Sequence, residues 1–149
     1  MKNIILCILI FLLIFLYGCN FQNQLFADEC SEMIYNVVKT SYNNYGDFSK
    51  LPKKYQGLVS EDYYDRMNYR ENDNGEYGKL GVDYYEKNIL TYPITEIKGN
   101  EIYVSYSYTY ECYSCSDDDL LRGSSNIPVK ITLEKDGDNY IIVDYYESP

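Results

Sequence analysis

The pattern of apolar and polar residues along this 149-residue chain changes twice. A continuous apolar run from Ile4 to Leu16 comes first. Residues 28–67 then repeat apolar side chains at helical spacing, and residues 89–146 alternate apolar and polar side chains as strands do. Helices first and strands after them, without strand–helix–strand alternation, predict an α+β domain of N-terminal helices packed on an antiparallel sheet.

Three helices are predicted before residue 68. The first is expected to begin at Asp28, whose side chain can cap it, and to end at residues 45–47 (Tyr-Gly-Asp). A shorter helix over residues 48–58 follows, and Ser60 has the pattern of an N-cap for the third. Residues 71–81 are polar and glycine-rich, which predicts a loop. The expected apolar face of the first helix consists of Cys30, Ile34, Val37, Val38, Ser41 and Tyr45.

About four strands are predicted in the second half, because the alternation is interrupted by three turn signals. Pro93 marks the first strand as an edge strand or a bulged one. The pair Asp136-Gly137 is typical of a tight hairpin turn, and residues 112–126 read as a long loop. The predicted strands are Ile89–Ile97, Ile102–Tyr110, Ile127–Glu134 and Tyr140–Tyr146.

Three segments carry a resemblance to a known family. They read SYNNYGDFSKLPKKYQGLVSEDYYDRM, ITEIKGNEIYVSYSYTYE and VKITLEKDGDNYIIVDYYE. In element order and hydrophobic pattern, residues 28–147 resemble a nuclear transport factor 2-like (cystatin-like) domain in a bacterial lipoprotein. The resemblance implies a cone-like fold with a strongly curved sheet around a cavity. Members range from isomerases to non-catalytic modules, and Tyr140 stands where the last strand usually has tryptophan.

The N-terminus predicts where the protein is located. Lys2 followed by the run from Ile4 to Leu16 has the charge and length of a secretion signal and is too short to cross a bilayer. The pair Gly18-Cys19 resembles a bacterial lipobox, which implies cleavage after residue 18 and a lipid on Cys19. We therefore expect a lipoprotein signal peptide over 1–18, a lipidated tether over 19–27 and the domain over 28–149. An uncleaved anchor and an ordinary signal peptide are the alternatives.

The predicted signal peptide and lipid site imply a protein of the bacterial cell envelope. It would be held on the outer face of the cytoplasmic membrane, or in an outer membrane if the source has one.

The amino-acid composition argues against several kinds of partner and catalytic site. The chain carries 23 acidic and 13 basic residues, a net charge of −10, which argues against nucleic acid as a partner. It has no histidine, which excludes Ser-His and Cys-His nucleophile activation and most zinc sites. No cofactor or metal is expected. The expected partners are the membrane, through the lipid, and an unknown protein or small ligand.

Of the five cysteines, Cys7 lies in the expected signal peptide and Cys19 is the expected lipid site. Cys30, Cys112 and Cys115 remain. A Cys112–Cys115 disulfide over a tight turn is favoured, with Cys30 buried and free. Pairing of Cys30 with either of the other two is the alternative. The run of residues 117–119 (Asp-Asp-Asp) with Asp136 or Asp138 lacks calcium-loop spacing and predicts a solvated acidic loop instead.

Tyrosine is the remaining candidate for chemistry, with 20 in the chain. Tyr106, Tyr108 and Tyr110 share one face of a predicted strand, where they either fill the core or line a cavity. Asp144 is the carboxylate within the strongly apolar end of the last predicted strand. Its side chain can face either the cavity or solvent. No residue is predicted to be catalytic.

The sequence therefore favours a membrane-tethered, non-enzymatic binding domain. One alternative is an isomerase- or hydratase-type enzyme with a carboxylate base in a tyrosine-lined cavity. The other is an inhibitor or immunity-type lipoprotein acting on a basic cell-wall enzyme.

Overall fold

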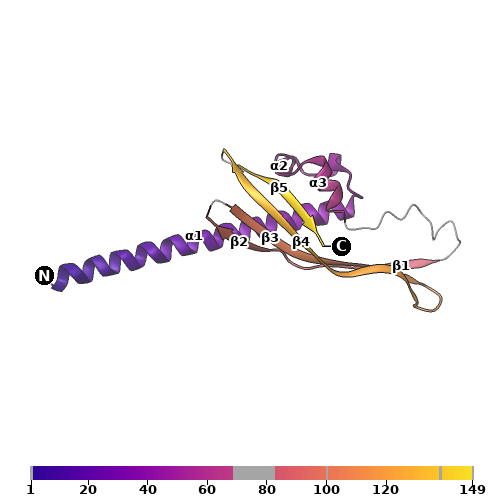
Figure 1. Cartoon of the computed structure of the whole chain (residues 1–149), viewed down its shortest axis with the longest axis horizontal. Helices are drawn as coiled ribbons and strands as arrows, with labels where there is room; N and C mark the ends of the chain where they lie inside the picture. The colour runs from indigo at the N-terminus through magenta and orange to yellow at the C-terminus, as the bar shows by residue number, and fades with distance from the viewer. Residues whose placement is uncertain (1, 69–82, 100, 138, 149) are drawn as a thin grey trace.

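The structure, a computed structural model, describes residues 2–68, 83–99, 101–137 and 139–148, with side chains from residue 23 onward. Helices come first and strands follow, as predicted (Figure 1). The helices are α1 (Lys2–Asn43), a short 3₁₀ turn η1 (Phe48–Lys50), α2 (Lys53–Gln56) and α3 (Glu61–Arg66). The strands are β1 (Tyr84–Leu90), β2 (Ile94–Lys98), β3 (Glu101–Ser114), β4 (Leu120–Asp136) and β5 (Asn139–Glu147).

The strands form one antiparallel sheet in the order β1-β3-β4-β5, with β2 beside β1 on the same edge of β3. The single first strand predicted over residues 89–97 is therefore two strands, and the sheet has five rather than about four. Pro93 lies in the gap between them and has no N–H to donate, so the ladder with β3 is interrupted there. Thr91 continues the contact with β3: its N–H donates to the Ser107 carbonyl oxygen at 2.9 Å, and its hydroxyl oxygen accepts the Ser107 N–H at 2.8 Å.

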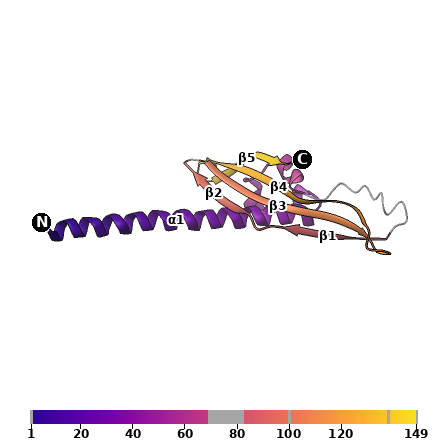
Figure 2. The same ribbon diagram turned by 60° about the horizontal axis from the view of Figure 1, so that its bottom comes forward.

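Helix α1 does not begin at Asp28. It is continuous from Lys2, so residues 19–27 are helical, and its N-terminal half projects beyond the sheet (Figures 1 and 2). From Cys19 to Asn43 the sequence contains neither glycine nor proline, so nothing interrupts the helix at Asp28. Within the described part of the chain, no helix carries an apolar stretch sufficient to cross a membrane.

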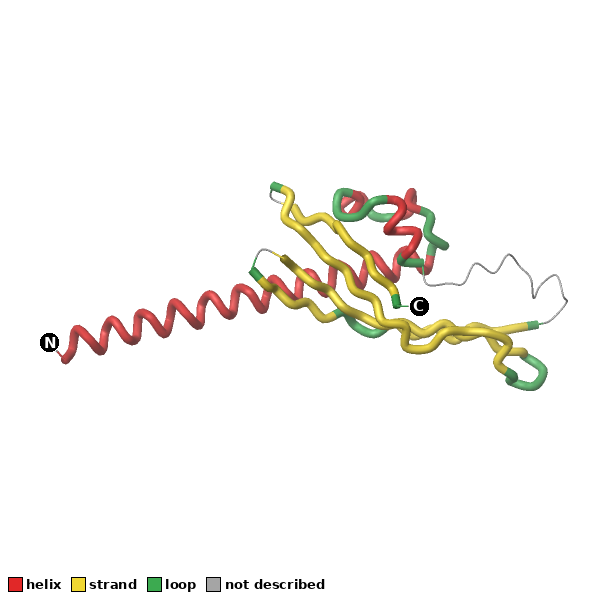
Figure 3. The backbone as a smooth tube through the Cα atoms, in the orientation of Figure 1, coloured by secondary structure: helices red, strands yellow, loops and turns green. Residues whose placement is uncertain are grey.

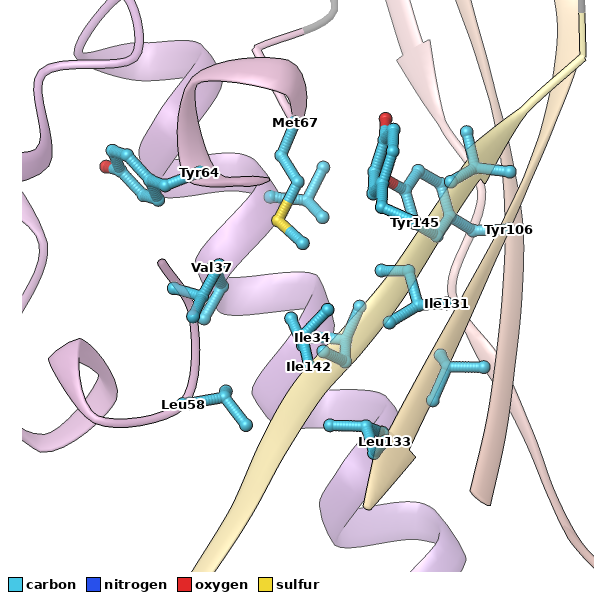
Figure 4. Close-up of a cluster of buried hydrophobic side chains, with 14 of the residues drawn as sticks. Ile34, Val37, Leu58, Tyr64, Met67, Tyr106, Ile131, Leu133, Ile142 and Tyr145 are labelled. Carbon is cyan, nitrogen blue, oxygen red and sulfur yellow. The ribbon is translucent and has the colours of Figure 1, made fainter. Parts of the chain in front are cut away.

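The core lies between one side of α1 and the inner face of the sheet, as Figure 4 shows for Ile34, Val37, Ile131 and Leu133. The face predicted for α1 is buried except at Tyr45, which is 68% exposed. The helix ends at Asn43 and Tyr45 has a positive φ of 56°, which turns its side chain off the helical face. The other residues of that predicted face are buried: Cys30, Ile34, Val37, Val38 and Ser41.

The segment from η1 to α3 covers the outer edge of β5. The Ile142 N–H donates to the Leu58 carbonyl at 2.8 Å, and the Tyr63 hydroxyl donates to the Val143 carbonyl at 3.0 Å. These bonds satisfy edge groups that would otherwise be available to another strand. Ser60 caps α3 as predicted, because its hydroxyl accepts the Tyr63 N–H at 3.3 Å.

Residues 112–126 are not a long loop. β3 continues to Ser114 and β4 starts at Leu120, which leaves a turn of residues 115–119 (Figure 3). Before Val129, β4 pairs with β3 but not with β5, so this stretch is polar and lacks the apolar alternation of an inner strand. The predicted loop over residues 71–81 lies outside the described residues.

Replacing Gly123 with alanine should destabilise the domain by about 1–3 kcal/mol, the usual cost of overpacking. An added Cβ would lie 2.5 Å from the Tyr110 carbonyl oxygen and 2.8 Å from the Glu111 Cα, both backbone atoms. The matched control is Gly57→Ala, where no atom lies within 4 Å of the new Cβ. Urea unfolding measures both free energies, and equal values for the two variants would contradict the prediction.

Candidate functional site

The tyrosines singled out by the sequence lie on the inner face of β3. Tyr106, Tyr108 and Tyr110 are only 6%, 8% and 2% exposed and belong to the core cluster. Asp144 lies elsewhere: it is exposed on β5, paired with Thr132 of β4. The structure therefore brings the three tyrosines together but does not bring Asp144 to them.

A first polar cluster forms around Glu147 at the end of β5. Its carboxylate accepts hydrogen bonds from the Tyr108 hydroxyl at 2.7 Å and the Tyr145 hydroxyl at 3.1 Å. Burial, followed by the charge of Glu147, raises the pKa of Tyr145 far above its usual value. The Arg66 guanidinium lies 5.0 Å from the Tyr145 ring centroid. Tyr145 therefore keeps its hydroxyl proton at physiological pH and donates it toward Glu147.

A second cluster surrounds Glu86 on the neighbouring part of the sheet. Cys112 of β3 lies opposite Glu86 on β1 and opposite Arg122 on β4, the two strands that flank it. The Glu86 carboxylate lies 3.3 Å from the Tyr42 hydroxyl and 3.4 Å from the Tyr110 hydroxyl. Burial, then the charge of Glu86, raises the pKa of Tyr110 to about 12, and the nearby Arg122 acts in the opposite direction.

Sequence reasoning missed Glu86, Arg122 and Glu147. Glu147 lies two residues beyond Tyr145, so continued alternation could have placed it on the inner face. Glu86 and Arg122 lie in stretches that were not assigned as strands, so no alternation could be applied to them. The pairing of Glu86, Cys112 and Arg122 across β1, β3 and β4 exists only in the folded sheet.

The predicted Cys112–Cys115 disulfide does not form, and no disulfide joins Cys30, Cys112 and Cys115 in the described residues. β3 is extended up to Ser114, so the two cysteines are separated by strand backbone, which advances about 10 Å over three residues. Cys112 is buried and Cys115 is exposed. Cys30 is buried and free, as predicted, and burial raises the pKa of its thiol to about 11.

The acidic run of residues 117–119 occupies the exposed turn between β3 and β4. In the described ranges of the chain, no group of three or more cysteine or carboxylate side chains is arranged to hold a metal ion. The pKa of the Asp117 carboxyl is lowered, because hydrogen bonds stabilise its charged form. The donors are the Ser114 hydroxyl, the Asp119 N–H and the Ser116 hydroxyl. The turn is thus an ionised, hydrogen-bonded surface feature.

An open hollow lies at the other end of the sheet, where α1 leaves the domain. It has a volume of about 620 Å³, and we name it the α1 cleft. Asn23 and Phe26 of α1 form one side, and the β2–β3 and β4–β5 hairpins form the rest. Its lining residues are Asn23, Phe26, Ile97, Gly99, Glu101, Ile102, Glu134, Lys135 and Tyr140.

Comparison with solved structures identifies the fold. A nuclear transport factor 2 (NTF2-like) superfamily protein from Salmonella enterica serovar Typhimurium superposes with a TM-score of 0.50 at 11% identity, over 85% of this chain and 92% of that one. This chain has a nuclear transport factor 2-like fold. At this identity the likeness establishes the architecture and does not select a function.

Two weaker structural similarities accompany it. One is to a de novo designed β-sheet protein, at a TM-score of 0.42 and 15% identity over 84% of this chain and 90% of that one. The other is to a Bdellovibrio bacteriovorus protein, at a TM-score of 0.43 and 17% identity over 82% of this chain and 40% of that one. No family model matches this chain, and no curated protein matches its sequence.

The Glu86 cluster gives a titration test. Glu86→Gln should lower the pKa of Tyr110 from about 12, because the negative charge beside its hydroxyl is removed. NMR titration of tyrosine labelled at the ring carbon that carries the hydroxyl measures this pKa. Glu147→Gln is the matched control, because Glu147 bonds to Tyr108 and Tyr145 instead. An unchanged Tyr110 pKa in Glu86→Gln would be the contrary result.

Thiol reactivity of the folded domain should follow burial. Cys115 is exposed and should be alkylated rapidly under native conditions, whereas Cys30 and Cys112 should react only when the protein unfolds. The raised pKa of Cys30, about 11, adds a second reason for its slow reaction. Mass spectrometry after timed alkylation measures the order, with a urea-treated sample as the control. Rapid native labelling of Cys30 would be inconsistent with the described packing.

Proposed function

We propose that this protein is a lipid-anchored extracytoplasmic module that binds a ligand or a protein partner and does not catalyse a reaction. The course of α1 carries the proposal. The predicted lipid site Cys19 lies in the same uninterrupted helix whose later residues Ala27, Cys30 and Ile34 are buried in the domain. The anchoring residue and the folded core are therefore parts of one secondary-structure element.

A helical connection changes how the domain is presented. Helices rise by about 1.5 Å per residue, so the eight residues from Cys19 to Ala27 span about 12 Å. A helix of this length does not collapse or swing as a coil of equal length does. The proposed module would therefore stand close to the membrane with its long axis continuing that of α1.

The polar groups of the inner face support a binding role over catalysis. Glu147 is held by two tyrosine hydroxyls, and Tyr106, Tyr108 and Tyr110 are packed in the core. Each oxygen of the Glu147 carboxylate already accepts a hydrogen bond from the protein, so neither faces an open space where a substrate could bind it. We therefore place binding on the outside of the domain and in open hollows, away from the tyrosine stripe.

One observation favours a second candidate, an isomerase- or hydratase-type enzyme. The Glu86 carboxylate is half-buried, and its bonds to Tyr42 and Tyr110 are 3.3 and 3.4 Å long, near the limit for a hydrogen bond. A carboxylate beside tyrosine donors is the arrangement that such chemistry uses. If Glu86→Gln abolished the protein's cellular role while folding and anchoring persisted, this candidate would replace the first.

Cys19→Ser should abolish incorporation of labelled fatty acid and retention of the protein in the membrane fraction, because the lipid-bearing thiol is removed. Cys7→Ser is the matched control, since Cys7 lies inside the apolar run and is expected to leave with the signal. Metabolic labelling and membrane fractionation in the source bacterium measure both effects. Unchanged labelling and retention of Cys19→Ser would disprove the lipoprotein proposal.

A further inference from the structure

The outer face of the sheet, opposite to the face that packs on α1, carries exposed apolar side chains at one end. Tyr85 and Ile89 of β1 are 43% and 50% exposed. Glu86, the neighbour of Tyr85 in β1, accepts a hydrogen bond from Tyr42 of α1 and therefore points to the inner face. Because successive side chains of a strand point to opposite faces, Tyr85 and Ile89 lie on the outer one.

Two aromatic rings of this outer face stack across neighbouring strands. Tyr85 lies opposite Tyr113 of β3, and their rings are nearly parallel, at an interplanar angle of 15°, with centroids 5.4 Å apart. Leu120, which lies opposite Tyr113 on β4, is 56% exposed. Exposed apolar side chains grouped in this way are typical of an interaction site. We name the surface formed by Tyr85, Ile89, Tyr113 and Leu120 the outer patch.

Carboxylates hold the hydroxyl groups of the outer patch. The Asp118 carboxylate accepts a hydrogen bond from the Tyr85 hydroxyl at 3.2 Å, and the Glu111 carboxylate accepts one from the Tyr113 hydroxyl at 2.8 Å. Hydrogen bonds from the Ser125 and Tyr113 hydroxyls lower the pKa of Glu111, so this carboxylate is ionised at neutral pH. Negative charge therefore lies directly beside exposed aromatic rings.

The charge of this surface selects the kind of partner. Residues 117–119 and Glu111 bring four carboxylates to the outer patch, whereas Lys87, opposite Glu111, brings one ammonium group. On a chain of net charge −10, such a surface repels anionic ligands and attracts cationic ones. The acidic turn alone is a solvated loop, and the exposed rings beside it add apolar contact area. Arginine matches both parts, because its guanidinium pairs with carboxylates and stacks on aromatic faces.

We propose that the outer patch binds an arginine-bearing segment of a partner protein, which deepens the binding function proposed above by naming the chemistry of the partner. A guanidinium group lies against the Tyr85 ring and pairs with the second oxygen of the Asp118 carboxylate. Cation–π attraction and ion pairing then act on the same group. Apolar side chains of the same segment cover Ile89 and Leu120.

The position of the outer patch in the molecule is compatible with this role. β1 and the β3–β4 turn lie at the end of the sheet away from the emergence of α1 (Figures 1 and 3). If Cys19 carries the anchor, as proposed above, the outer patch lies at the end of the domain away from the bilayer. A partner protein can approach it there without contacting the membrane.

The test measures, by fluorescence anisotropy, how a labelled octapeptide of alternating arginine and leucine binds the full protein, as isolated from its membrane and placed in phosphatidylcholine nanodiscs. At an ionic strength of about 0.15 M, charges more than about 8 Å away are largely screened, so local contacts decide the affinity. Saturable binding is expected. Tyr85→Ala and Asp118→Asn should each weaken it about threefold to fivefold, as loss of an exposed cation–π or ion-pair contact does.

The matched controls are Tyr146→Ala and Asp144→Asn, which replace an exposed tyrosine and an exposed aspartate of β5, outside the outer patch. Both should keep the wild-type affinity. The substituted side chains are exposed, and asparagine tolerates the positive φ of 59° at Asp118, so the variants are expected to fold.

Four outcomes would overturn the patch proposal. They are no saturable binding, equal weakening by the control variants, equal affinity for an octapeptide of alternating arginine and glycine, and self-association of the protein that depends on Tyr85 and excludes the peptide. The last outcome would assign the outer patch to a second copy of the chain. The titration does not require that Cys19 be lipidated. Failure of the Cys19→Ser experiment therefore removes the anchor alone, and failure of the titration removes the outer patch alone.

Discussion

The packing of one helical face of α1 against the inner face of the sheet is the contact on which the rest of the structure depends. Ile34, Val37 and Val38 are fully buried there, opposite Val104 and Ile131 of the sheet. Each such side chain contributes about 1.5–3 kcal/mol through burial. This contact fixes where the helix leaves the domain, and thereby where the α1 cleft and the predicted lipid site lie.

Tyrosine fills the part of the interior that aliphatic side chains do not. Its ring is buried like a hydrocarbon, but its hydroxyl needs a hydrogen-bond partner. Glu147 and Glu86 provide those partners at two places along the sheet. Carboxylates are therefore placed beside the core, where tyrosine hydroxyls donate hydrogen bonds to them.

The two ends of the domain differ in chemistry. At one end α1 emerges beside an open cleft lined by Phe26, Tyr140 and Lys135. At the other end the turn between β3 and β4 carries the three aspartates of residues 117–119. In a lipid-anchored molecule this difference would direct the end where α1 emerges to the bilayer and the acidic end away from it.

The sequence by itself determined the element order, the face of α1 from Cys30 to Ser41, the Ser60 cap and the core strand around Tyr106, because these depend on local periodicity and capping. It did not determine the continuous helix through Cys19, the split at Pro93, or the extension of β4 to Leu120. Strand pairing decided the last two, since polar edge segments lack alternation. Only the tertiary structure brought Glu86 and Arg122 beside Cys112, and Lys135 beside Tyr140, because cross-strand register joins residues that no local pattern connects.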